Sequence, residues 1–216
     1  MKFESSAQSR GTQRKLWATC LVAAACSIIF SQSTLSQSVL LKEKENAIFI
    51  FGGVGSGDKV TVFNLGIGGT YNARFDLGAS MGFIVPGDIP PFLLNQAFSV
   101  LLVKERLPWS SIFLSIDQSF NIVGSHEALS LGGSFTHKLR AGKRNSFLYS
   151  FGAHRLIALD TATESTIIFP LSLSLANYSR KSIFLFSTSV AYATNNTVTY
   201  GVGFSISLIQ AKKEDW

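Results

Sequence analysis

The sequence predicts a closed antiparallel transmembrane β-barrel, and two features of the chain carry this prediction. From Asn46 onward, segments alternate strictly between bulky apolar residues and small or mildly polar ones. Period two is the period of a β-strand. Most segments run eleven to fourteen residues, which exceeds the roughly 5–6 residues of an average soluble strand and suits the roughly 9–11 that a tilted membrane strand requires.

Residues 73–85 show the alternation most clearly. Phe75 and Leu77 share one face with other bulky residues, whereas Asp76 and Ser80 share the opposite face with glycines. A soluble barrel fills its interior with large apolar groups and places charges outside. The reverse distribution suits a barrel whose bulky residues face acyl chains and whose narrow lumen holds Gly, Ser, Thr and Asn.

Closure follows from the bilayer itself, because strands can pair every backbone N–H and C=O in lipid only within a closed barrel. We therefore expect an up-and-down barrel of ten strands joined by short hairpins, with eight strands as the alternative. The expected strands span residues 47–55, 60–71, 73–85, 92–104, 110–122, 128–139, 146–159, 165–177, 182–194 and 197–209. With an even number of strands, both ends of the barrel segment lie on the periplasmic side.

The N-terminus predicts export. Basic residues precede an apolar run at 16–30, and small polar residues follow it, which is the pattern of a secretory signal peptide. The run is shorter than the ~20 residues that cross the hydrocarbon as a helix. We expect a signal peptide at 1–33 with cleavage between about 33 and 38, then a short periplasmic segment at 34–45. The barrel at 46–210 and a C-terminal tail at 211–216 complete the domain organisation.

Composition excludes several classes of function. Both cysteines, Cys20 and Cys26, lie in the expected signal peptide, so that the mature chain has neither a disulfide nor a catalytic thiol. The alternative is a lipoprotein that is cleaved before Cys26. The formal net charge of +6 is partly carried by the same segment, and no basic stripe with interleaved aromatics is present. Nucleic acid is therefore not an expected partner.

Charged and polar residues on the inward face form the candidate site. We expect a hydrogen-bonding network in the lumen in which buried charges are compensated by partners. Its members are Arg74, Asp76, Asn95, Asp117 and His154. Arg74 and Asp76 are two positions apart, so they are expected to share a face and to pair. His154 can meet Asp117 only if the register of the strands brings them together.

The three histidines do not predict a catalytic or metal centre. His126 falls in an expected loop, His137 falls on the lipid face near a turn, and His154 alone points inward. His126 and Glu127 would need a third ligand to make a metal site. We therefore expect no catalytic residue, no cofactor and no metal, and the balance is against an enzyme.

The alternating strands of residues 46–210, the signal peptide and the cysteine-free mature chain resemble the small outer-membrane β-barrels of Gram-negative bacteria as a class. The resemblance implies residence in the outer membrane, contact with its lipid and lipopolysaccharide, and insertion by the barrel assembly machinery. Barrels of this class often end in a strand with a C-terminal aromatic residue. Here the chain continues past its last strand to Trp216.

The expected function is a structural or narrow-permeability role of the porin-like kind. The class also includes lipid A-modifying enzymes and a ten-stranded protease family, so one alternative is a barrel-embedded hydrolase acting on lipid A or peptides. The other alternative is an exported soluble β-barrel that binds a ligand.

Overall fold

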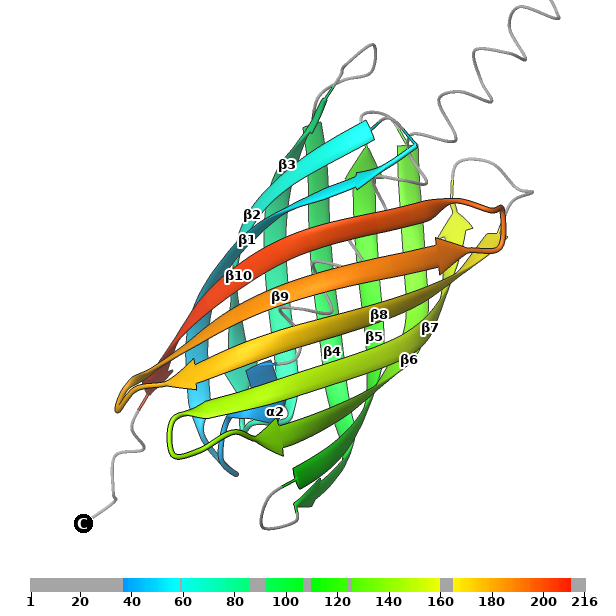
Figure 1. The fold of residues 1–216 in the computed structure, drawn as a ribbon. Helices are drawn as coiled ribbons and strands as arrows, with labels where there is room; N and C mark the ends of the chain where they lie inside the picture. Colours follow the sequence, from blue (N-terminus) through cyan, green and yellow to red (C-terminus); the bar gives the residue numbers. More distant parts are fainter. Residues whose placement is uncertain are drawn as a thin grey trace, which may run out of the picture.

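The computed structural model describes residues 37–58, 60–85, 92–106, 110–123, 126–159 and 165–210. Ten antiparallel strands form a closed barrel in which each strand pairs with its neighbours in sequence (Figure 1). Pairing of the first strand with the last closes the sheet. The ten-strand prediction is therefore confirmed, and the eight-strand alternative is wrong.

The strands lie close to the expected ranges. They are β1 (Asn46–Gly57), β2 (Val60–Tyr71), β3 (Phe75–Val85), β4 (Phe92–Arg106), β5 (Ser110–Val123), β6 (His126–Arg140), β7 (Asn145–Ala158), β8 (Ser165–Tyr178), β9 (Ser182–Ala193) and β10 (Val198–Gln210). We call the end of the barrel that holds Asn46 and Gln210 the terminal mouth, and the opposite end the distal mouth. His126, which we expected in a loop, begins β6 and pairs with Val123.

β3 begins two residues later than the alternation predicted, because a turn occupies residues 72–74. Asn72 and Ala73 take left-handed backbone conformations, with φ of 53° and 50°. Positive φ at both central positions is the geometry of the two-residue turns that join antiparallel strands. The strand alternation therefore does not extend back to Arg74, which is exposed.

The outer wall carries a continuous apolar surface. Bulky residues point outward at alternate positions of every strand, and many keep about half of their side-chain surface exposed, such as Leu171 at 46% and Leu65 at 61%. A water-soluble protein does not expose apolar patches of this extent. The surface suits acyl chains, and the fold is a transmembrane β-barrel.

Tyrosines mark both edges of the apolar surface, as the aromatic girdles of membrane barrels do. Tyr71 and Tyr149 point outward near the terminal mouth, and Tyr192 and Tyr200 do so near the distal mouth. The Tyr149 hydroxyl lies 2.7 Å from Nδ1 of His137, and the two rings meet edge to face. His137 thus lies on the outer face near a turn.

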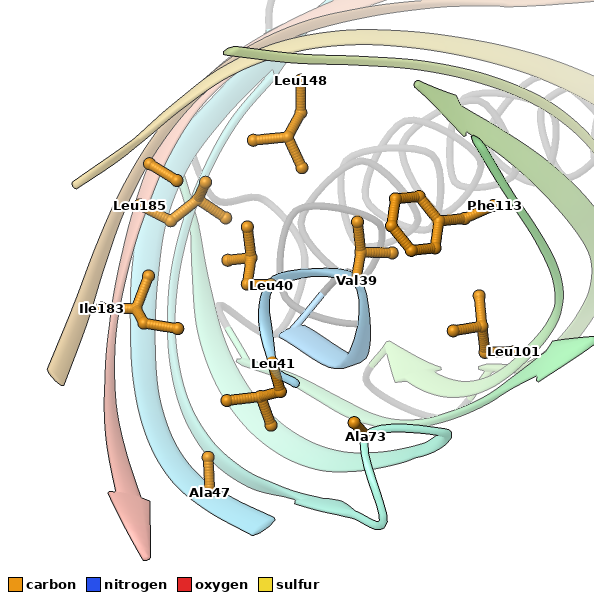
Figure 2. Packing of buried hydrophobic residues seen from close by; sticks show 11 residues of the cluster. Val39, Leu40, Leu41, Ala47, Ala73, Leu101, Phe113, Leu148, Ile183 and Leu185 are labelled. Atoms are coloured by element: carbon orange, nitrogen blue, oxygen red, sulfur yellow. The ribbon is translucent and has the colours of Figure 1, made fainter. Parts of the chain in front are cut away.

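Inside the barrel, apolar residues gather at the two mouths, and small polar residues occupy the middle. A cluster at the terminal mouth includes Phe113, Ile183 and Leu185 from the strands (Figure 2). Two clusters lie toward the distal mouth, one around Val62 and the other around Ile168. Between them the wall is largely Ser, Gly, Thr and Asn. No α-helix among the described residues is both long and apolar enough to cross a bilayer.

An arginine on the outer wall tests the position of the membrane. We expect Leu171→Arg, in the middle of β8, to lower the free energy of unfolding from lipid by about 2–4 kcal/mol. Leu208→Arg, near the terminal mouth, should lower it by about 0–1 kcal/mol. Urea titration of the barrel in phosphatidylcholine vesicles measures both. Equal costs at the two positions would contradict a bilayer centred on the barrel.

Candidate functional site

The segment before β1 folds back into the lumen and fills the terminal mouth. Residues Gln37–Leu40 form the single helical turn α2, and all four are buried. Figure 1 shows α2 inside the barrel. Val39, Leu40 and Leu41 pack against the apolar cluster of the wall, as Figure 2 shows. We call residues 37–41 the plug.

Polar contacts hold the first two plug residues. The Gln37 amide nitrogen donates to Ser205 Oγ at 2.7 Å, and the Ser207 hydroxyl donates to Gln37 Oε1. Both serines lie on the lumen face of β10, two residues apart, so one amide can engage them together. The backbone N–H of Ser38 donates to Asp76 Oδ2 at 3.2 Å. These contacts fix the position of α2 along β10 and β3.

Two lysines hold the other end of the plug. Lys104 Nζ donates to the carbonyl oxygens of Ser38 at 3.4 Å and Leu41 at 3.1 Å, and Lys138 Nζ donates to that of Val39 at 3.5 Å. A helix of one turn leaves these carbonyl groups without partners inside the helix. The ammonium groups supply the missing donors and place positive charge at the C-terminal end of α2, where it is favourable.

A β-bulge brings Lys104 into the lumen. The pairing of β4 with β5 shifts by one residue between Leu101 and Val103, so that Lys104 lies opposite the inward-facing Phe113. Without the extra residue, the alternation of β4 would direct Lys104 toward lipid. The sequence carries no turn residue at this point that signals the bulge. The contribution of Lys104 to the lumen was therefore missed.

Asp76 is the carboxylate that anchors the plug. It is fully buried, and its Oδ1 accepts from the Thr70 hydroxyl at 2.6 Å while its Oδ2 accepts from Ser38. The expected ion pair with Arg74 does not form, because Arg74 lies in the exposed turn that ends at β3. Neutral donors therefore take the place that we assigned to the guanidinium.

Asp117 is the centre of a second buried cluster, halfway along the lumen. Its Oδ1 accepts from the hydroxyls of Ser99 at 2.6 Å and Ser115 at 3.0 Å, and the Ser134 hydroxyl donates to Oδ2. His154 Nε2 lies 3.9 Å from the same Oδ2, and both side chains are almost wholly buried. The register of the strands thus brings His154 to Asp117.

Gly132 makes this approach possible. The register places Asp117 opposite Gly132 and Gly132 opposite His154, in one row across β5, β6 and β7. A Cβ at position 132 would lie 2.5 Å from both Cγ and Nδ1 of His154. The imidazole therefore crosses β6 over a residue that has no side chain, and a larger residue there would push it away from Asp117.

The donors in this cluster are arranged around the carboxylate. A Ser–His–Asp hydrolase needs a hydroxyl that donates to the imidazole and an imidazole that donates to the acid. Ser99 and Ser134 instead direct their single hydroxyl protons to Asp117. Within the described residues, no group of three His, Cys, Asp or Glu side chains could hold a metal ion.

Asn95 lies nearer the distal mouth, apart from both carboxylates. It pairs with Asn121 across β4 and β5, and both side chains are buried. Among the described residues, the side-chain oxygens of Asn95 and Asn121 have no hydrogen-bond partner. The side-chain oxygen and nitrogen of Asn64 on β2 also have none there. Such groups are where folded proteins bind internal water.

The five expected site residues therefore separate into four places. Asp117 and His154 meet in the middle of the lumen, and Asp76 binds the plug. Asn95 lies toward the distal mouth, and Arg74 lies in an exposed turn at the terminal mouth. Sequence reasoning missed the plug and its two lysines. The sequence offered one signal. Lys138 alternates with the inward-facing residues of β6, so its charge had to enter the lumen and needs a partner there.

No family model matches the chain, and no curated protein matches it. Among solved structures, it is similar to a loop-deletion mutant of OmpT, an outer membrane protein of Vibrio cholerae, with 12% identity and a TM-score of 0.36. That match covers 76% of this chain and 59% of the other, so the chain spans less than two thirds of that protein's length.

Two further structures match over almost their whole length. An outer membrane channel from Pseudomonas putida F1 shows 9% identity and a TM-score of 0.47, with 79% of this chain and 97% of that chain covered. The outer membrane protease OmpT from Escherichia coli shows 7% identity and a TM-score of 0.43, with 81% and 100% covered. At these identities the likeness concerns the barrel fold alone.

The role of Gly132 can be tested by adding one methyl group. We expect Gly132→Ala to lower the free energy of unfolding by at least about 1–3 kcal/mol, because the new Cβ overpacks against the backbone carbonyl oxygen of Ala153 and the ring of His154. Gly78→Ala is the matched control on the lumen face of β3, where the nearest heavy atoms would lie at 3.6 Å. Urea unfolding in neutral detergent measures both, and equal losses would refute the steric argument.

The docked plug narrows the range of about 33 to 38 within which signal cleavage is expected. Cleavage after Ser38 would remove Gln37 and Ser38, which provide the contacts to β10 and to Asp76. Cleavage after Ser33 preserves both residues. We expect mass spectrometry of the exported protein to give Thr34 as its first residue. A mature chain that begins at Val39, or at a lipidated Cys26, would contradict this expectation.

Proposed function

We propose that the chain is an outer-membrane barrel with a structural role, and that its permeability is limited by the plug. The observation that carries the proposal is the seating of residues 37–41 in the terminal mouth, where Leu40 and Leu41 are 4% and 2% exposed. A permanently open channel would leave this mouth to water. Here an apolar segment of the same chain occupies it.

Location in the outer membrane is supported by the apolar outer wall, the tyrosines at both edges and the signal-like N-terminus. The terminal mouth then faces the periplasm, because a barrel inserted from that side keeps both ends of an even number of strands there. Lipid and lipopolysaccharide are the partners of the outer wall, and the assembly machinery is the partner during insertion. Export by cleavage of residues 1–33 belongs to the same proposal.

Energetics favour the plugged state. Withdrawing the plug would expose Val39, Leu40 and Leu41 as well as the wall that they cover, and each fully buried side chain of this size contributes about 1.5–3 kcal/mol. Asp76 would lose one of its hydrogen-bond donors while it remained inside the barrel. The closed form is therefore the resting form.

A hydrolase is supported less well by the same residues. Asp117 and His154 lie deep in the lumen, whereas the loops at the rim are the usual place for groups that meet a substrate. The serines around Asp117 stabilise its charge and have no hydroxyl proton left for His154. This cluster has the features of a structural lock between β4, β5, β6 and β7.

Single-channel recording in planar lipid bilayers tests the plug. We expect low conductance from the mature chain and a larger, steady conductance after deletion of residues 34–41. Asp76→Ala should give intermittent openings, because loss of its hydrogen bonds weakens the plug by about 1–3 kcal/mol. That change corresponds to a rise of about tenfold in the open population for every 1.4 kcal/mol.

Asp58→Ala, at an exposed carboxylate of the distal mouth, is the control and should leave the recordings unchanged. A mature chain that conducts as well as the deletion variant would show that the plug does not limit permeability. Heat-modifiable mobility in gels confirms that each variant has folded.

A further inference from the structure

A cavity of about 510 Å³ opens at the terminal mouth between the plug and the barrel wall. Its volume falls within the roughly 300–1,000 Å³ of known small-molecule sites. Residues of the plug form one side, and residues of β5 to β10 with the turns at 141–144 and 179–181 form the other. Figure 2 shows Leu40, Leu41 and Ile183 in this region.

The cavity has an apolar floor and a basic rim. Leu40, Leu41, Phe113 and Ile183 lie beneath the floor and are almost wholly buried, and the half-buried Tyr178 and Ile209 supply its accessible apolar surface. Five cationic side chains line the rim, namely Lys42, Lys138, Arg140, Lys143 and Arg180. Glu45 is the single carboxylate among the lining residues, and its Oε2 already accepts the backbone N–H of Lys42 at 2.7 Å.

This charge distribution makes an anion favourable. Cations that share one concave site repel one another, and low-dielectric walls concentrate their field in the cavity. Lys138 reaches deepest, with Nζ 5.0 Å from the centre of the Tyr178 ring and 3.5 Å from the carbonyl oxygen of Val39. Lys143 and Arg180 are exposed on the turns above it. A head group that enters from the mouth therefore meets positive charge from two turns and from the wall.

We propose that the cavity binds an anionic amphiphile, which places a phosphate or carboxylate head among Lys138, Lys143 and Arg180 and a short apolar chain on Tyr178 and Ile209. The plug forms one wall of the site, so the ligand binds the closed barrel and stabilises it by linkage. The cavity exists whether or not the plug limits conductance, so the binding assay can fail independently of the recordings proposed above.

The test uses the full mature barrel in phosphatidylcholine nanodiscs with labelled Leu and Ile methyl groups. Hexyl phosphate is soluble in water and serves as the probe. We expect saturable chemical-shift changes at Ile209, and none of that size at the outward-facing Ile206 and Leu208. Parallel changes at inner and outer methyl groups would mean partition into the bilayer, and would overturn the proposal.

Substitutions at the rim test the contribution of charge to binding. The double variant Lys143→Gln/Arg180→Gln should weaken hexyl phosphate binding by about tenfold, because two charge-assisted contacts are lost. Arg155→Gln, an exposed arginine near the distal mouth, should not change it. An unchanged affinity in the double variant, with the methyl spectrum of the folded barrel intact, would overturn the proposal.

Three further probes identify the chemistry that is recognised. The affinities of hexanoate and hexyl phosphate show whether a carboxylate or a phosphate head group is preferred. Tighter binding of either one supports an anionic amphiphile. Hexyltrimethylammonium should not bind, and its binding with equal affinity would show that charge plays no part. Inorganic phosphate should bind more weakly than hexyl phosphate, and equal affinity would show that the apolar floor plays no part.

Discussion

The requirement that every backbone polar group be paired in lipid is the constraint on which the rest of this structure depends. It forces the sheet to close, as β1 does against β10, and closure divides each strand into a lipid face and a lumen face. Bulky side chains then fit on the outer face, where they meet acyl chains and not other side chains of a core. The lumen of a small barrel must take small residues, and this leaves room at the terminal mouth for a segment of the chain itself.

Among the described residues, neutral N–H and O–H groups supply the hydrogen bonds of the two buried carboxylates in the lumen. Asp76 takes the hydroxyl of Thr70 and a backbone N–H from the plug, and Asp117 takes three serine hydroxyls beside His154. Short hydroxyl side chains reach a carboxylate across one strand spacing at low entropic cost. The abundance of serine on the inner face therefore has a structural reason beyond filling space.

The sequence predicted the strands and their faces well, because alternation is a local property and the apolar outer face is visible at every second residue. It failed where a backbone dihedral or a distant contact decides the outcome. Arg74 has the parity of Asp76, but left-handed conformations at Asn72 and Ala73 interrupt the strand. Lys104 has outward parity until the bulge after Leu101 reverses it. The pairing of His154 with Asp117 depends on register, and plug docking depends on contacts as remote as Gln37 with Ser205.

The plug also gives a physical reason for the basic character of the terminal mouth. The carbonyl groups at the end of α2 need donors, and Lys104 on β4 and Lys138 on β6 provide them from the two strands that flank β5. Without the bulge, Lys104 would face lipid near the terminal mouth at a cost of about 0–1 kcal/mol, and the carbonyl groups of the plug would lose their donor. Lys143 and Arg180 lie beyond the reach of these carbonyl contacts and line the cavity instead. One concentration of positive charge thus holds the chain's own segment and leaves a basic rim facing the solvent.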